Sequence, residues 1–285
     1  MHRMRLTRNR HHVLGWLLAT AAVAGCAARS TPAVAPHPTD RVPARPDARL
    51  MPMTWRSLVQ FDRSDSIVLT LPAGATQVQR MTRHATFTLT VGPQAAVTVR
   101  LDSLAMSPAP GPTSPGVVGT VWTGRMLGSR VEWLTTTGGG PVVEDLRVDV
   151  EGLFPSLPPR GVSAGTRWAD TSTTKGRVDI FETTQRLVMK WVAGSDTAVA
   201  GAAVLPLHAT GELEQSGKGA GAGVAMTMTG QGIRSYIYYL SKSGQVRLVV
   251  RRDSMNVLIS VPVSHQLVPT VRLIQSRATF RDNTP

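Results

Sequence analysis

The chain has 285 residues, with 31 lysines and arginines, 18 acidic residues and a single cysteine. One cysteine excludes an internal disulfide and a cysteine-based metal site, so the folded body must be stabilised by its core alone. The basic residues are scattered rather than gathered in a stripe with aromatic residues, which argues against nucleic-acid binding. The formal charge of +13, or +9 without the four arginines of residues 1–12, favours attraction to anionic envelope surfaces.

Residues 1–25 have the pattern of an export signal. The first 12 residues carry four arginines and no acidic residue, and the apolar run "VLGWLLATAAV" follows at residues 13–23. This run is too short for a membrane-spanning helix, which needs about 20 apolar residues, but it suits the core of a signal peptide. We therefore predict a secretory signal over residues 1–25.

The stretch Val23-Ala24-Gly25-Cys26 resembles the lipobox of bacterial lipoproteins. The resemblance implies cleavage before Cys26 and attachment of a diacylglycerol to its thiol, so Cys26 is the predicted lipidation site. Ala27 stands where many enterobacterial lipoproteins of the inner membrane have aspartate, which favours the outer membrane with the body facing the periplasm. Acyl chains on Cys26 would then hold the protein to the membrane. An ordinary signal peptide with a chance cysteine is the alternative.

Residues 26–52 predict a lipidated N-terminus followed by a disordered tether. The segment contains six prolines, which prevent the growth of a helix or a sheet. Such a chain is extended and should hold the folded body some tens of Å from the bilayer.

From residue 53 onward, apolar and polar residues alternate with the period of two that is typical of half-buried antiparallel strands. Phe87, Leu89 and Val91 alternate with threonines, Val97, Val99 and Leu101 with polar residues, and residues 246–261 show the same pattern, with Arg247 and Arg251 on the polar side. The pattern predicts a specific set of inward and outward side chains. Those expected inside are Phe87, Leu89, Trp133, Trp191, Ile237 and Val257, and those expected outside are Thr88, Lys190 and Asn256.

The predicted fold is mainly β, or β-rich α+β, with two related antiparallel halves that form a sandwich or half-barrel. The halves are residues 53–152 and 171–285, joined by a hinge at residues 153–170. Apolar residues at helical spacing predict one short helix over residues 142–154, although "LRVDV" within it also alternates like a strand. Residues 67–134 and 178–250 share a succession of strand, polar stretch and Thr-Gly dipeptide. The alternatives are a duplication and the general likeness of any two runs of alternating strands.

The hinge resembles a segment of uncharacterised secreted bacterial lipoproteins, in which a Gly-x-x-Trp follows a proline-ended apolar stretch. Here Gly165 and Trp168 occupy that motif. The resemblance implies a two-part β-rich body without an assigned activity. Trp168 is expected to close the core of the second half, with stacking on a ligand as the alternative.

Three motifs of enzymes are incomplete in this chain. Residues 161–165 match G-x-S-x-G around Ser163, but neither flank has the strand and helix of a nucleophile elbow. Lys218 lies in "SGKGAGAG", which departs from a P-loop in spacing and is expected to be a flexible loop. His84, His208 and His265 are far apart in sequence. We therefore predict no catalytic, cofactor-binding or metal-binding residue, and no cofactor.

Three functions remain open. The first is a non-catalytic envelope lipoprotein that binds an apolar ligand or an envelope partner, as β-rich lipoproteins such as the LolA-like half-barrels cup a hydrophobic molecule. The second is a structural or assembly role in the cell envelope. The third is an extracytoplasmic hydrolase, which is disfavoured because no catalytic motif is complete.

Overall fold

The computed structural model describes residues 54–71, 74–109, 116–127, 130–178, 180–221 and 223–282. The predicted signal peptide, the lipidation site Cys26 and the tether of residues 26–52 lie outside these ranges. The anchoring of the protein therefore stays a prediction.

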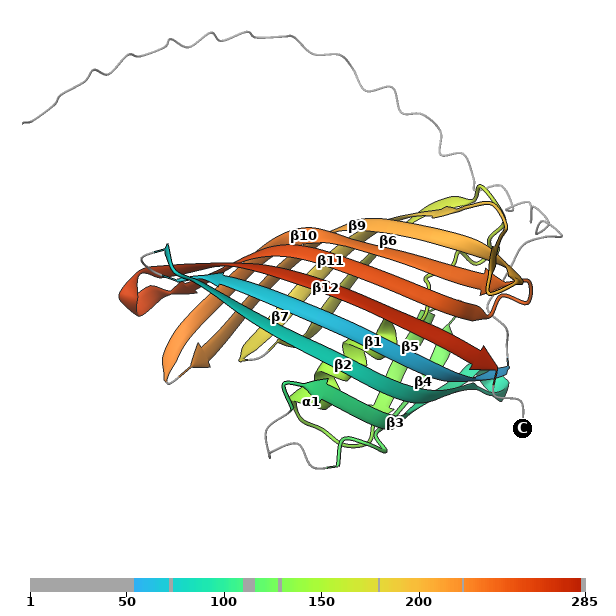
Figure 1. Ribbon diagram of the computed structural model, residues 1–285, viewed down its shortest axis with the longest axis horizontal. Helices are drawn as coiled ribbons and strands as arrows, with labels where there is room; N and C mark the ends of the chain where they lie inside the picture. Colours follow the sequence, from blue (N-terminus) through green and yellow to red (C-terminus); the bar gives the residue numbers. More distant parts are fainter. Residues whose placement is uncertain are drawn as a thin grey trace, which may run out of the picture. The chain divides into compact units, whose positions relative to one another are not determined.

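The described chain folds into one antiparallel sheet of twelve strands with a single α-helix (Figure 1). The strands are β1 (Trp55–Thr70), β2 (Thr76–Val91), β3 (Ala96–Ser107), β4 (Val121–Leu127), β5 (Arg130–Thr136), β6 (Arg167–Val178), β7 (Phe181–Ala193), β8 (Thr197–Val199), β9 (Ala202–Gly221), β10 (Val224–Ser241), β11 (Val246–Val261) and β12 (Gln266–Asp282). The helix α1 spans Pro141–Glu151. The predicted β-rich fold class is confirmed.

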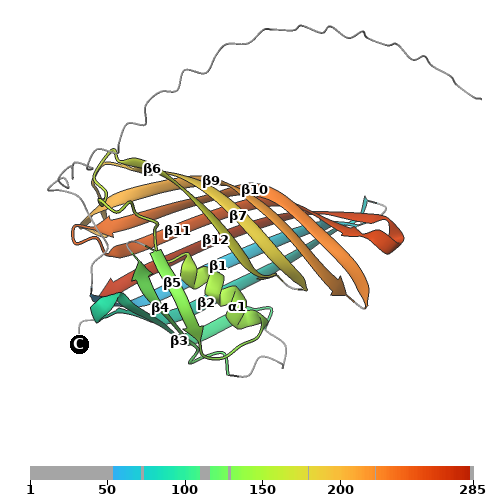
Figure 2. The same ribbon diagram turned by 180° about the vertical axis from the view of Figure 1, so that it is seen from behind.

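The order of the strands in the sheet is β5-β4-β3-β2-β1-β12-β11-β10-β9-β7-β6, with the short β8 paired to β9. The strands before α1 thus form one side of the sheet and those after it form the other. The two sides join where β1 pairs with β12, from Ser57 opposite Asp282 to Leu69 opposite Thr270. The sheet does not close, because β5 and β6 stand at its two ends. It curves around α1 (Figure 2), and we call this arrangement the open half-barrel.

The core lies between the concave face of the sheet and α1. The side chains of Phe87 and Leu89 are fully buried there, as their alternation with threonine predicts. The ring of Phe87 packs edge-on against Phe61 and Trp122, with 6.2 Å between centroids in both pairs. Trp133 packs against this core from β5 and is partly buried.

Two predicted side-chain directions in the second half are wrong. Ile237 lies on the convex face, and its neighbours Tyr236 and Tyr238 point inward and are buried. Arg251, expected outside, is also buried. The cause for Arg251 is a β-bulge: Tyr239 pairs with Leu248 and the next residue of β10 pairs with Val246. The extra residue reverses the alternation of β11 after this point. In β10 the alternation is unbroken, and it directs the two tyrosines inward instead of Ile237.

The helix begins and ends one to three residues earlier than the predicted range of 142–154. Pro141 occupies its first turn, where the missing N–H of proline costs nothing, and it follows Gly140 at a φ of 105°. The buried face of the helix consists of Val143, Leu146, Asp149 and Val150. An aspartate thus occupies a position that an apolar stripe would fill.

The glycine-rich segment at residues 216–223 is wrongly predicted as a loop. Its residues up to Gly221 continue β9, and Lys218 is an exposed strand residue opposite Glu182 of β7. Glycine permits this close pairing, because a Cβ atom on Gly219 would lie 2.4 Å from the carbonyl oxygen of Ile180. Side-chain patterns cannot reveal such a strand, since glycine contributes no side chain.

Candidate functional site

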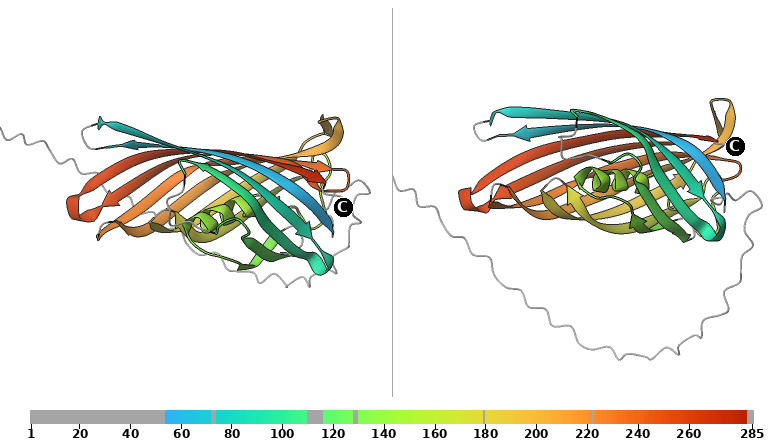
Figure 3. Two further views of the ribbon diagram at one scale, coloured as in Figure 1. Left: turned by 60° about the horizontal axis from the view of Figure 1, so that its bottom comes forward. Right: turned by 90° about the horizontal axis from the view of Figure 1, so that it is seen from below.

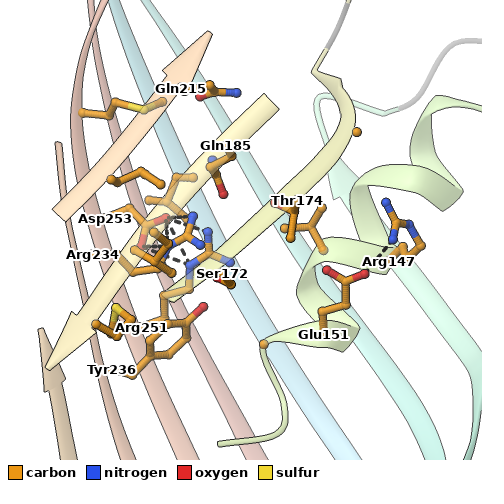
Figure 4. Close-up of a pocket in the computed structure, with 18 of the residues that line it drawn as sticks. Arg147, Glu151, Ser172, Thr174, Gln185, Gln215, Arg234, Tyr236, Arg251 and Asp253 are labelled. Carbon is orange, nitrogen blue, oxygen red and sulfur yellow. Dashed lines mark hydrogen bonds and ion pairs between the residues drawn. The ribbon is translucent and has the colours of Figure 1, made fainter. Parts of the chain in front are cut away.

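A cavity of about 220 Å³ lies between α1 and the concave face of the second half of the sheet. Its lining comes mainly from α1, β6, β7, β9, β10 and β11. Figure 4 shows Arg147 and Glu151 on α1, across the cavity from Arg234, Arg251 and Asp253 on β10 and β11. We call this space the concave cavity.

Two arginines share one carboxylate in the wall of the concave cavity. The Nε atom of Arg234 lies 3.1 and 3.0 Å from the two carboxylate oxygens of Asp253. Arg251 donates to the same carboxylate from Nε, at 3.1 and 3.2 Å, and from Nη2, at 2.5 Å. Arg234 pairs with Asp253 across the two strands, and Arg251 precedes Asp253 by two residues, so all three side chains share the concave face.

The cluster of Arg234, Arg251 and Asp253 carries one net positive charge. Burial would raise the pKa of Asp253, but the charges and hydrogen bonds of the two arginines outweigh it and hold this pKa well below its ordinary value. Burial would lower the pKa of Arg251, but Tyr236 and Asp253 keep it well above its ordinary value. Guanidinium groups stay protonated in proteins and this aspartate is ionised at neutral pH, so two positive charges share one carboxylate within the cluster. The charge of Asp149 also acts on Arg251.

Further polar groups of the described chain line the concave cavity without a hydrogen-bond partner. Within the described part of the chain, the side chains of Gln185, Gln215 and Tyr236 form no hydrogen bond, although Gln215 and Tyr236 are only 5% and 8% exposed. Ser172 and Thr174 of β6 face the same space (Figure 4). Because buried polar groups normally have partners, these groups are available to water or to a bound molecule.

Apolar side chains form the remainder of the lining. Trp191 is stacked on Trp168 at 5.4 Å between ring centroids and contacts Tyr238 at 5.8 Å. The predicted role of Trp168 in closing the core fits this stack, and its indole N–H donates to the carbonyl of Ser156 at 2.8 Å. The apolar residues that reach the cavity are Val148, Phe154, Leu187, Met189, Trp191, Leu213, Met255 and Ile274. The cavity is therefore amphipathic.

A buried network of charges holds α1 against β1 and β2. Asp149 accepts hydrogen bonds from Arg63 at 2.7 Å and from Arg83 at 2.6 Å, and its side chain is 1% exposed. Arg63 also forms two hydrogen bonds of 2.7 Å with Asp65, and Arg83 bonds Asp145. Burial would raise the pKa of Asp65 and Asp145, but the neighbouring arginines hold both below the ordinary value. With each charge paired, the network fixes the helix that covers the cavity.

The side of α1 that faces the cavity carries its own ion pairs. Arg147 donates to Glu151 at 2.6 Å and to Glu144 at 3.2 Å. Burial raises the pKa of Glu151, and Arg147 offsets only part of that rise. These charges stand opposite the arginine pair of β10 and β11 (Figure 4).

The residues of the incomplete motifs do not line the concave cavity. Ser163 is buried in the segment that connects α1 to β6 along the chain, and its hydroxyl lies 3.5 Å from that of Thr166. His208 is exposed on β9, and His265 lies in the turn before β12 at a φ of 52°.

Among the described residues, no three His, Cys, Asp or Glu side chains are grouped so as to hold a metal ion. In the same part of the chain, no helix has the length and apolarity needed to cross a bilayer.

Sequence reasoning missed the residues that make the cavity polar. Arg234 and Tyr236, and likewise Arg251 and Asp253, are two residues apart and thus on one face of a strand. That spacing could have identified a charged concave face, but only if the bulge at the start of β11 had been known.

Neither a protein-family model nor a curated protein matches this chain.

Proposed function

We propose that the protein is a non-catalytic binding protein of the cell envelope, and that its concave cavity holds a small amphiphilic molecule with an anionic head group. The observation that carries this proposal is the buried arginine pair of Arg234 and Arg251. The pair shares a single carboxylate and stands beside an apolar lining.

The anionic head group is inferred from the balance of charge. Two guanidinium groups and one carboxylate leave one positive charge on this wall of the cavity, where a charge without a close counter-ion is costly. The carboxylates of Glu144 and Glu151 stand across the cavity and are paired with Arg147. A ligand carboxylate or phosphate would balance the positive charge, and a guanidinium group binds such planar or branched anions through paired hydrogen bonds. Gln185, Gln215 and Tyr236 add groups that can complete the hydrogen bonds of the head group.

The apolar part of the ligand is inferred from the residues beside this cluster. Leu187, Leu213, Met255 and Ile274 offer a surface on which each buried methylene group of a ligand gains about 0.8 kcal/mol. A wholly apolar ligand would suit the cavity less well, because it would bury the arginine pair without balancing its charge. We therefore propose an amphiphile in place of the apolar ligand that the sequence alone led us to expect.

The location of the protein is part of the proposal. Acyl chains on Cys26 would hold it to the outer membrane on the periplasmic side, and the half-barrel would bind its ligand there. A ligand carried in the envelope without chemical change also agrees with the incomplete catalytic motifs.

The proposal is tested by comparing probes that differ only in the head group. Octanoate, octanamide and acetate are titrated into the full chain in phosphatidylcholine vesicles, and binding is followed by tryptophan fluorescence, since Trp191 lines the cavity. Octanoate is expected to bind at least about tenfold more tightly than octanamide, because hydrogen bonds to a charged group contribute about 1.5–3 kcal/mol. Acetate is expected to bind more weakly still, because it lacks the chain.

A matched pair of variants assigns the effect to the cavity. Arg234→Gln removes the excess charge and leaves Asp253 paired with Arg251, so the preference for octanoate should disappear. Arg186→Gln removes an arginine from an exposed pair with Glu214 and should leave the preference unchanged. Equal binding of octanoate and octanamide by the unsubstituted chain, or no binding of either, would refute the proposal and favour a structural role.

A further inference from the structure

Three neighbouring hairpins of the sheet extend beyond α1 at the end opposite to the C-terminus (Figures 1 and 3). Their turns connect β1 to β2, β9 to β10 and β11 to β12, and these six strands are consecutive in the sheet. We call the described residues 66–71, 74–79, 219–221, 223–231 and 256–271 the projecting end. None of these residues lines the concave cavity or belongs to the charge network of α1.

The projecting end contains no lysine, arginine, aspartate or glutamate. Charged residues make up 17% of the whole chain, so three stretches of this length would ordinarily contain several of them. Hairpin turns of water-soluble proteins are also the usual places for polar and charged residues. The composition therefore calls for an explanation other than the packing of a core.

Apolar side chains at the projecting end are exposed. Val263 in the turn before β12 is 81% exposed, Leu267 is 56% exposed and Val78 is 51% exposed. Leu71 and Leu258 are each 38% exposed. A group of exposed apolar side chains marks a surface that meets another molecule or a membrane.

We propose that the projecting end inserts shallowly into the surface of a lipid bilayer. A protein partner would ordinarily be recognised through aromatic side chains and arginine at such a surface, and the projecting end has neither. Its backbone is also suited to lipid, because adjacent strands pair and two of the three turns are closed by hydrogen bonds. The N–H of Gly74 donates to Leu71 at 3.1 Å and that of His265 to Pro262 at 3.3 Å.

The reach of the chain agrees with this orientation, provided that Cys26 is anchored as proposed. Strand β1 has 16 residues, which corresponds to about 53 Å, and it begins at the end opposite to the projecting end. The residues between Cys26 and Trp55 can span at most about 100 Å when fully extended. An N-terminus held in a bilayer therefore leaves enough chain for the projecting end to reach the same bilayer.

The concave side of the projecting end leads toward the concave cavity. Met228 and Val257 lie on this side and are buried, and Met255 follows at the cavity itself. An amphiphile that leaves the bilayer would thus meet apolar side chains along its way to the arginine pair. This route rests on the proposed function, whereas the membrane contact does not.

The test uses a fluorescent label on the full chain in phosphatidylcholine vesicles. Val263→Cys is labelled with the environment-sensitive dye NBD, and Ser243→Cys, an exposed site in the β10–β11 turn at the opposite end, is the matched control. The unsubstituted chain gives the background from Cys26. The label at residue 263 should shift its emission to the blue and be quenched by brominated acyl chains, and the label at residue 243 should do neither.

A second pair of variants asks whether apolarity is the cause. Leu267→Asp, made in the Val263→Cys chain, should lower the ratio of inserted to free label about tenfold, which corresponds to ~1.4 kcal/mol. Gln275→Asp, on the same face of β12 but far from the turn, should leave the ratio unchanged. Circular dichroism checks that both variants keep their β structure.

Three results would overturn the proposal. The first is an equal response of the labels at residues 243 and 263, and the second is an unchanged response in the Leu267→Asp chain. The third is a blue shift that occurs without vesicles and grows with protein concentration, which would assign the surface to a second copy of this chain. Each of these results is independent of whether octanoate binds in the concave cavity.

Discussion

Replacing Asp149 by asparagine should strongly destabilise the protein, because Asp149 joins α1 to the sheet through two buried arginines. The change removes a carboxylate that lies 2.7 Å from Arg63 and 2.6 Å from Arg83. Breaking a buried ion pair by removal of one partner costs about 3–5 kcal/mol, since a charge is left without compensation. Arg63 retains Asp65 and Arg83 retains Asp145, so we expect the lower part of this range, about 3 kcal/mol.

The loss of stability is measured as a decrease in the midpoint of thermal unfolding of the full chain. Unfolding is monitored by circular dichroism, with all variants in the same detergent. For a domain of about 230 residues, 1 kcal/mol corresponds to about 2–4 °C, so the midpoint should fall by about 6 °C or more. Asp102→Asn is the control, because Asp102 pairs with Arg100 near the surface and should cost no more than about 1 kcal/mol. Hydrogen exchange should also accelerate in α1. Equal midpoints for the two variants would refute the assigned role of the network.

Three further outcomes follow from the structure. Gly232→Ala should destabilise by about 1–3 kcal/mol in equilibrium unfolding, because a Cβ atom there would lie 2.2 Å from the carbonyl oxygen of Ser254. Gly139→Ala, which meets no atom within 4 Å, should cost little. The unfolding midpoint should fall as the pH drops below the ordinary carboxyl pKa of 3.8. In that range the unfolded chain takes up protons while carboxylates with lowered pKa values stay ionised, namely Asp65, Asp145 and Asp253. A midpoint that does not change with acid would contradict the contribution of these pairs to the free energy of unfolding. Glu151 has the opposite effect on stability, because its pKa is raised in the folded chain. Cys26→Ala should release the protein from the membrane fraction or block its processing, and unchanged fractionation and migration would show that Cys26 is not an anchor.

The alternation of residues was sufficient to predict the fold class and part of the core. Phe87, Leu89 and Val91 alternate with threonine, so only one face of their strand can be buried, and this choice is confirmed. The helix was predictable for a related reason, since Leu146 and Val150 share one side at helical spacing and both are buried.

The polar cavity could not be predicted, because two of its causes leave no signal in the sequence. In β10 both alternating sets are large and β-prone, so Ile237 competes with Tyr236 and Tyr238 for the inward positions, and the pairing decides between them. In β11 the bulge changes the phase and brings Arg251 inside. Buried arginines such as Arg83 also look like surface residues until their distant aspartate partners are known.

The pairing of β1 with β12 has a consequence for how the protein folds. These two strands come from opposite ends of the described chain, yet they are neighbours in the middle of the sheet, with Ser57 opposite Asp282. The centre of the sheet therefore cannot form until almost the whole chain has been synthesised, and contacts so distant in sequence slow folding. Until then β1 and β11 each present an unpaired edge, at which an incomplete chain can join another and aggregate.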